Sequence, residues 1–186
     1  MNVNIEIIRS RRRSISITVD GPDHVTVRAP SRMTDREIRA FVDSKRAWLE
    51  KHLAIAAEKR EAAANAATLT QAEMNTLVNA AKTYIPQRVE YYSRLMGVKC
   101  SGITIRCQKT RWGSCSSRGS LNFNCLLMLA PAEEVDYVVV HELCHLKEMN
   151  HSPRFWAEVA KVMPDYRTRV AWFKKHGTEI MSRRPE

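Results

Sequence analysis

The sequence lacks two kinds of apolar segment. It has no run of about 18 apolar residues, the length that a membrane-spanning helix needs. Its first residues, Met-Asn-Val-Asn-Ile-Glu-Ile-Ile-Arg, lack the order of basic, apolar and small residues that marks a secretory signal peptide. The first absence excludes a helical membrane span. The second leads us to expect a cytoplasmic protein with no membrane partner.

The chain also lacks paired cysteines. No two of them have Cys-x-x-Cys spacing, and their number is odd: Cys100, Cys107, Cys115, Cys125 and Cys144. A disulfide framework uses an even set, and a structural zinc knot uses closely spaced pairs. Neither can therefore be the basis of this fold. At most of these positions we expect small buried apolar side chains.

Acidic residues are too few to balance the basic ones. The chain has 30 lysines and arginines against 20 aspartates and glutamates, a formal net charge of +10. Arg9 and the three arginines at 11–13 form the tightest basic cluster. Such an excess favours encounter with nucleic acid, although it is as often only a solvated surface. No RNA- or DNA-binding motif accompanies it, so nucleic acid stays an alternative partner.

The 186 residues suit one domain of ordinary size. Alternating apolar residues around the turn signal Asp-Gly-Pro-Asp predict a β-meander at 1–30. Capping-box spacing, with Thr followed three residues later by Glu, predicts two helix starts in a helical segment at 31–98. The remaining segment, 99–186, contains two apolar runs at 102–107 and 120–129 that predict the strands of a β-hairpin. Together these patterns predict an α+β fold.

Residues 141–151 read His-Glu-Leu-Cys-His-Leu-Lys-Glu-Met-Asn-His and indicate the chemistry. Residues four apart on an α-helix share a face, so His141 and His145 can offer two imidazoles to one ion. Glu142 lies beside that ion and can deprotonate a metal-bound water, the arrangement of a zinc metallopeptidase. Pro131 followed by two glutamates predicts a helix start, and the apolar run at 136–140 places the motif on a core helix. The alternative is two core histidines with Glu142 in a surface ion pair.

A catalytic zinc site needs a third protein ligand and leaves its fourth position for water. Glu148 lies on the same helical face, but a continuing helix rises about 1.5 Å per residue and carries Glu148 about a turn too far along the axis. His151 lies six residues past His145, which lets the chain turn back toward the metal. Asn150 tolerates the left-handed conformation and is the predicted turn residue. We therefore predict His151 as the third ligand, with Glu148 as the alternative.

Four further segments are distinctive: Gln-Lys-Thr-Arg-Trp-Gly-Ser-Cys-Ser-Ser at 108–117, Leu-Ala-Pro at 129–131, the stretch 138–156 around the motif, and Met-Pro-Asp-Tyr-Arg at 163–167. Together they resemble the YgjP-like family of predicted bacterial zinc metallopeptidases, relatives of the SprT-like proteins. The resemblance covers nearly the whole chain, and its central block is the most specific part.

The resemblance implies a compact zincin-like metallopeptidase core, with an N-terminal β-meander, long helices, a β-hairpin and a His-Glu-x-x-His active-site helix. It implies that the zinc-binding catalytic core lies at 99–186 of a single domain over 1–186. It also implies one Zn²⁺ ion held by His141, His145 and His151, with Glu142 as general base.

We therefore expect a monomeric zinc-dependent endopeptidase that acts on protein or peptide substrates. Two alternatives remain: a nucleic-acid-associated basic module with a structural metal site, and, from the SprT kinship and the charge, a protease that acts on DNA-bound proteins.

Other residues near the motif are candidates for supporting roles. An oxyanion stabiliser is needed, and the candidates are Tyr166, His176 and the loop around Arg111. Asp136 and Asp165 are candidates for orienting the histidines. Cys115 has an alternative role as a thiolate that binds zinc and holds the enzyme latent.

Overall fold

The computed structural model describes residues 3–185, so residues 1, 2 and 186 of the predicted domain lie outside the described residues. Helices and strands are mixed in the chain, which confirms the α+β class. The described residues fall into two compact units that divide between Asn65 and Ala66, inside the predicted helical segment 31–98. The single domain over 1–186 stays a prediction. No helix within residues 3–185 is long and apolar enough to cross a membrane.

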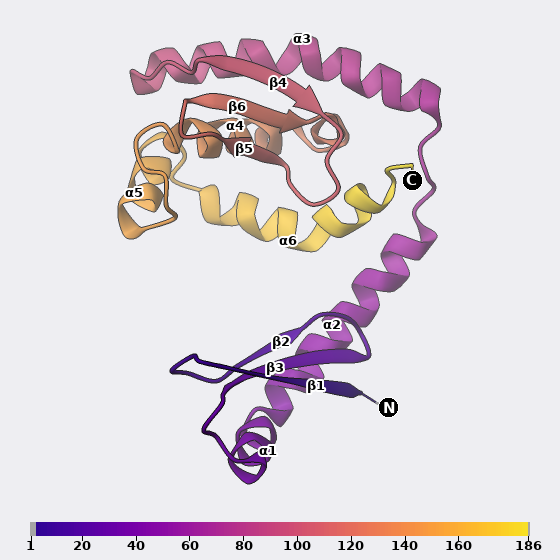
Figure 1. The fold of residues 1–186 in the computed structure, drawn as a ribbon. Helices are drawn as coiled ribbons and strands as arrows, with labels where there is room; N and C mark the ends of the chain where they lie inside the picture. The colour runs from indigo at the N-terminus through magenta and orange to yellow at the C-terminus, as the bar shows by residue number, and fades with distance from the viewer. Residues whose placement is uncertain (1–2, 186) are drawn as a thin grey trace. The chain divides into compact units, whose positions relative to one another are not determined.

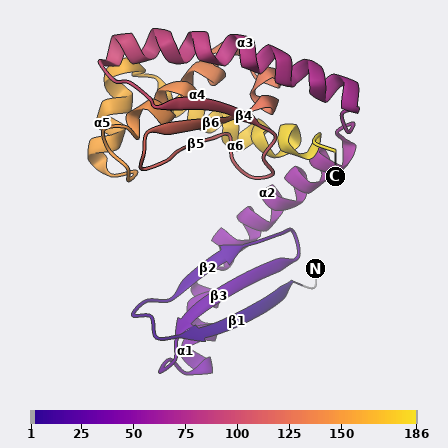
Figure 2. The same cartoon turned by 45° about the horizontal axis from the view of Figure 1, so that its top comes forward.

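The first unit contains a three-stranded sheet of β1 (Asn4–Ser10), β2 (Ser16–Val19) and β3 (His24–Pro30) (Figure 1). Figure 2 shows β3 between the other two strands. β3 pairs antiparallel with β2 but parallel with β1, so the predicted β-meander is wrong. Residue alternation identifies strands but does not determine their order. β3 is central because it carries the fully buried Val25, Val27 and Ala29 of this unit's core.

Two helices complete the first unit, α1 (Asp35–Ser44) and α2 (Arg46–Asn65). The predicted capping box opens α1: Thr34 Oγ1 accepts from the Glu37 backbone N–H at 3.3 Å, and the Glu37 carboxylate accepts from the Thr34 backbone N–H at 2.7 Å. Ile38 and Leu49 are the helical residues that join the core of this unit. The helix start at Thr34 is thus confirmed.

The second unit begins with α3 (Gln71–Met96), whose capping box at Thr70 and Glu73 is also present. A second sheet follows, with β4 (Gly102–Arg106), β5 (Gly113–Cys115) and β6 (Ser120–Asn124) in the order β4-β6-β5. The two predicted strands exist, but they pair in parallel. The hairpin is formed instead by β5 and β6, and β5 lies at the edge of the sheet.

Asn124 ends β6 earlier than predicted, and Cys125–Leu129 is a 3₁₀ helix, η1. The side-chain oxygen of Asn124 accepts from the Leu126 backbone N–H at 3.1 Å. Its amide donates to the carbonyl oxygens of Gln108 and Arg111, each at 2.9 Å. These three bonds turn the chain and tie the loop before β5 to the core.

The central helix of the second unit is α4 (Ala132–Cys144), which follows the predicted start signal at Pro131. It contacts α3, β5, α5 (Pro153–Val162) and α6 (Tyr166–Ser182). Its apolar residues are almost fully buried: Val135, Val138, Val139, Val140 and Leu143. Because neighbours surround α4, groups in its last turn are held rigidly against β5, α5 and α6.

Candidate metal centre

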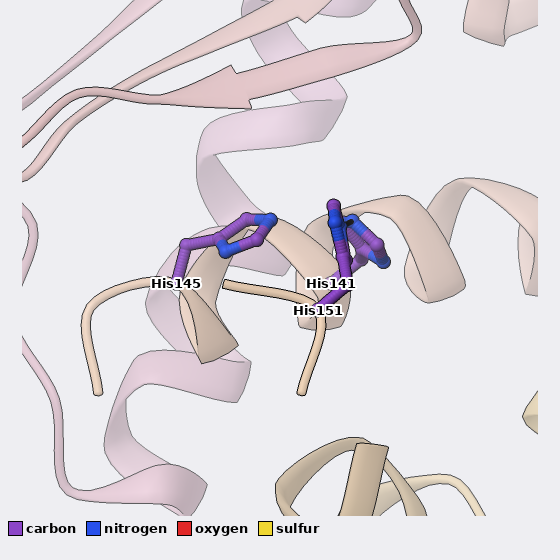
Figure 3. Close-up of side chains that lie close together, drawn as sticks. All are labelled: His141, His145 and His151. Atoms are coloured by element: carbon purple, nitrogen blue, oxygen red, sulfur yellow. Dashed lines mark hydrogen bonds between the residues drawn. The ribbon is translucent and has the colours of Figure 1, made fainter. Parts of the chain in front are cut away.

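Three histidines converge at the end of α4 (Figure 3). His141 lies in the last turn, and His145 caps the helix with helical backbone angles, φ −64° and ψ −18°. His151 lies on the returning chain, directly before Ser152, the N-cap of α5. One ring nitrogen from each of the three histidines lies within 4.8 Å of the other two. Glu148 is not part of this group, so the geometry favours His151 over Glu148 as third ligand.

The spacing of the imidazoles suits a zinc ion. Nε2 of His141 and Nε2 of His151 are 2.9 Å apart. Two nitrogens bound to the same tetrahedral zinc, each at about 2.0–2.1 Å from it, lie roughly 3.3 Å apart. A small outward movement of the two rings therefore makes room for the ion. Imidazole nitrogen is a preferred zinc ligand, so the donor set also fits.

A tight turn brings His151 back to the helix end. The backbone N–H groups of Lys147 and Glu148 both donate to the Cys144 carbonyl at 3.0 Å, and Ser152 N–H donates to the Asn150 carbonyl at 2.7 Å. No residue other than glycine has a positive φ within residues 3–185. The predicted left-handed Asn150 is therefore wrong, because bonds to the last helical carbonyls make the turn without it.

Glu148 contributes its backbone rather than its side chain. The Glu148 carbonyl oxygen lies 3.1 Å from Nδ1 of His145. A carbonyl oxygen can only accept, so Nδ1 of His145 is the protonated nitrogen and its Nε2 is free to bind a metal. The turn thus orients the second histidine as well as returning the third.

Aromatic side chains of α5 hold the three imidazoles. The Phe155 ring centroid lies 4.5 Å from that of His145 and 4.8 Å from that of His141, and Trp156 stacks on His151 at 5.8 Å. Burial, reinforced by the neighbouring histidines, lowers the pKa of His141 to about 3. Burial is also the main cause that lowers the pKa of His145. Neutral imidazoles are the form that binds metal, so this environment favours a metal site.

Glu142, the residue after His141, lies against Gly113 of β5. It is only 5% exposed. A Cβ atom at Gly113 would lie 2.6, 2.7 and 2.9 Å from Oε1, Cγ and Cδ of Glu142, so only glycine leaves room for this carboxyl. Burial raises the pKa of Glu142 to about 8, and the charge of Arg111 opposes the shift. A carboxyl with a pKa near neutrality can both accept and return a proton.

A pocket of about 390 Å³ opens beside Glu142 and His141. Its walls come from the loop before β5, from α4 and from α6. The lining residues are Arg111, Trp112, Gly113, Tyr137, Val138, His141, Glu142, Val170, Phe173 and Lys174. A largely apolar pocket with a few converging polar groups is typical of a substrate site.

The three predicted candidates for oxyanion stabiliser lie in different surroundings. Arg111 lines the pocket with Glu142. Tyr166 stacks on Trp156 with ring centroids 5.2 Å apart, and His176 packs on Trp172 at 4.8 Å. Of the three candidates, only Arg111 therefore shares the pocket with the proposed base.

The two predicted orienting aspartates are engaged elsewhere, so that prediction is wrong. Asp136 accepts from Arg88 Nε at 2.6 Å and Nη2 at 2.7 Å, which ties α4 to α3. Asp165 accepts from Arg169 at 2.7 Å on its own helix. Asp136 and Asp165, the N-cap residue of α6, thus have arginine partners rather than histidine partners.

Cys115 does not join the histidine group among the described residues. Its thiol is half-buried and lies 3.4 Å from the Ser116 carbonyl. Burial, with the nearby Glu142 carboxyl second, raises the pKa of the Cys115 thiol. Because the Cys115 thiol lies outside the histidine group, the structure gives no support to latency through Cys115.

Sequence reasoning missed three residues of the site. Tyr137 lies four residues before His141, and its hydroxyl is 3.5 Å from His141 Nδ1. This helical spacing is a signal that could have identified it. Gly113 belongs to the segment 108–117 that carries the family resemblance, and this segment was the signal available for it. Lys174 had no comparable local signal, because only tertiary packing brings it to the pocket.

The histidine group is consistent with a metallopeptidase, and a comparison with protein families identifies that class. A family model described as the YgjP-like metallopeptidase domain matches residues 13–77 and 58–176. These matches cover most of the chain, and the chain therefore belongs to the YgjP-like metallopeptidase family. Membership makes it a peptidase, a hydrolase that uses a metal ion and acts on peptide or protein substrates.

Two solved structures are similar over about half of the chain. The crystal structure of the metallopeptidase zymogen of Pyrococcus abyssi abylysin is 26% identical, with 49% of this chain and 93% of that chain covered and a TM-score of 0.45. The zymogen of Methanocaldococcus jannaschii jannalysin is 21% identical, with 47% and 94% covered and a TM-score of 0.41. A search of curated proteins gave no match.

Proposed function

We propose that the protein is a zinc-dependent endopeptidase with Glu142 as its general base. The supporting observation is the convergence of three histidines within 4.8 Å beside a buried carboxyl that lines a substrate-sized pocket. A purely structural metal site has no need of this glutamate. His141, His145 and His151 would hold the ion.

Zinc bound there would act as a Lewis acid and lower the pKa of a water molecule to about 7. Glu142 would take a proton from the attacking water and later return it to the leaving amine of the substrate. Its burial against Gly113 keeps bulk water away from the carboxyl, and its place beside His141 puts it next to the reacting atoms. The hydroxyl of Tyr137 supports the orientation of His141.

The edge strand β5 supports action within a chain rather than only at its ends. Gly113, the first residue of β5, lies against Glu142, and within residues 3–185 no strand pairs with the outer edge of β5. An extended peptide can add to such an edge as a further strand. Its scissile bond would then pass beside Glu142, with substrate residues on both sides of the cut.

Metal analysis and one isosteric variant test the proposal. We expect about one zinc per chain in wild type, as the three-histidine site predicts, together with cleavage of unfolded proteins. His151→Ala should lose the zinc, and Glu148→Ala, which keeps the backbone carbonyl, should retain it. Glu142→Gln should keep both zinc and fold and lose cleavage. Equal activity of wild type and Glu142→Gln, or zinc retained without His151, would contradict the mechanism.

A role on DNA-bound proteins has one observation in its favour. Arg11, Arg12, Arg13 and Arg32 line a single concavity of about 390 Å³ in the first unit, and the ion pairs of residues 3–185 involve none of them. Such a cluster suits phosphate groups. DNA should then stimulate cleavage at low salt, with the effect falling steeply as salt is raised. Unchanged cleavage at low salt would remove this candidate.

A further inference from the structure

The pocket beside Glu142 has features that select a substrate. Its walls are apolar and aromatic and are braced against one another: the rings of Trp112 and Phe173 lie 5.0 Å apart, and those of Phe173 and Tyr137 lie 6.1 Å apart. Val138 and Val170 complete the apolar lining. A pocket of about 390 Å³ with such walls suits one large apolar side chain.

The position of Glu142 indicates which substrate residue enters the pocket. In the proposed mechanism, on which this inference rests, Glu142 gives a proton to the leaving amine. That amine belongs to the residue that follows the scissile bond. Because Glu142 forms part of the pocket wall, the side chain of this same residue lies closest to the pocket.

Two exposed cations line the pocket with no carboxylate partner of their own. Arg111 comes from the loop before β5 and Lys174 from α6, and neither takes part in an ion pair within residues 3–185. Lys174 and Val170 also line an adjoining pocket of about 310 Å³, together with Arg167. Glu142 is the one acidic residue in the lining of either pocket. The rim is therefore strongly basic.

We propose that the pocket binds a large apolar side chain of the residue that follows the cut, and that Arg111 and Lys174 pair with a carboxylate next to it. An acidic side chain one residue further on can supply that carboxylate. The C-terminal carboxylate of the apolar residue itself is the other source, and cleavage there would be an exopeptidase activity beside the proposed endopeptidase activity. Both sources present a carboxylate to Arg111 and Lys174, and the peptides in the test distinguish one source from the other.

The test uses matched peptides with zinc-loaded wild-type protein, and kcat/KM is measured. Phenylalanine after the cut should be preferred over alanine by about tenfold or more, as apolar pockets discriminate by size. With phenylalanine in place, a following glutamate should be preferred over lysine by about two- to fivefold, the range of an exposed ion pair. This second preference should shrink as ionic strength rises. A peptide ending at phenylalanine, as free acid or as carboxamide, tests the C-terminal source.

Two variants test the residues themselves. Lys174→Glu should abolish the preference for glutamate over lysine, because the new carboxylate offsets the charge of Arg111. Lys175→Glu is the matched control, because Lys175 is the next residue of α6, is exposed and lines neither pocket. It should leave the preference as in wild type. Val170→Trp fills the pocket and should remove the advantage of phenylalanine over alanine, with thermal unfolding used to verify the fold.

Peptide binding to zinc-loaded Glu142→Gln, followed by fluorescence anisotropy, keeps this inference distinct from the proposed function. The same order of peptide preference in binding and in cleavage supports both this inference and the proposed function. Cleavage by wild type without a preference for phenylalanine, or without any preference for a carboxylate, overturns the inference and leaves the peptidase intact. Selective binding without any cleavage overturns the proposed function, and with it the assignment of the pocket to the leaving side.

Discussion

Gly113→Ala is the sharpest single test of how the site is positioned. The new methyl group would lie 2.6 Å from Oε1 of Glu142, about 0.8 Å short of the 3.4 Å at which ordinary contact begins. It would also meet Cγ at 2.7 Å and Cδ at 2.9 Å, so rotation of the carboxyl alone cannot relieve the clash. Glu142 or β5 must therefore move by most of an ångström.

Such a displacement should affect catalysis more than folding. A misplacement of about 1 Å can cost about a hundredfold in rate, so we expect kcat to fall by roughly that factor. Overpacking typically costs about 1–3 kcal/mol in unfolding free energy. Zinc content should not change, because the three histidines are untouched. A change confined to KM would indicate lost substrate binding rather than a displaced base.

Gly102→Ala provides the matched control. Gly102 is the first residue of β4 as Gly113 is of β5, and neither has a positive φ. A Cβ atom at Gly102 meets nothing within 4 Å. The control should keep wild-type kcat. Its unfolding free energy should be unchanged or raised by about 0.4–1 kcal/mol, because alanine reduces the conformational freedom of the unfolded chain. If Gly113→Ala keeps full activity with zinc bound, Gly113 does not position Glu142 and the steric argument is refuted.

Three further predictions concern charge. Burial raises the pKa of Glu142 from 4.5 to about 8, so the metal-free protein loses stability as pH rises through this window. In denaturant unfolding of the metal-free proteins, the stability of Glu142→Gln relative to wild type should increase from pH 4.5 to 8. A stability difference that stays constant over this range would contradict the raised pKa of Glu142. The pKa of His141 is lowered from 6.5 to about 3, so metal-free wild type should lose stability relative to His141→Gln as pH falls through that range. If the stabilities of the two proteins change in parallel with pH, the lowered pKa of His141 is refuted. Asp136→Ala breaks the pair with Arg88 and should cost about 1.5–3 kcal/mol in unfolding free energy. Zinc affinity should stay the same in this variant, and a large loss would restore Asp136 as an orienting residue.

Local patterns predicted the parts of the fold that depend on neighbouring residues. Both capping boxes, at Thr34 and Thr70, are present because each bond joins groups three residues apart. The helix start after Pro131 is confirmed for the same reason. Strand pairing was predicted incorrectly in both sheets. β1 and β3 lie in parallel, as do β4 and β6, and residue alternation is the same whichever neighbour a strand has.

The sequence by itself placed His141 and His145 on one helical face, because they are four residues apart, and put Glu142 beside them. Tertiary structure decided the rest. The turn that returns His151 depends on helix-end bonds rather than on Asn150. Gly113 and Lys174 reach the site from β5 and α6, which lie far from the motif in the chain. Their roles come from packing between elements, and no periodicity within one segment encodes which element packs against another.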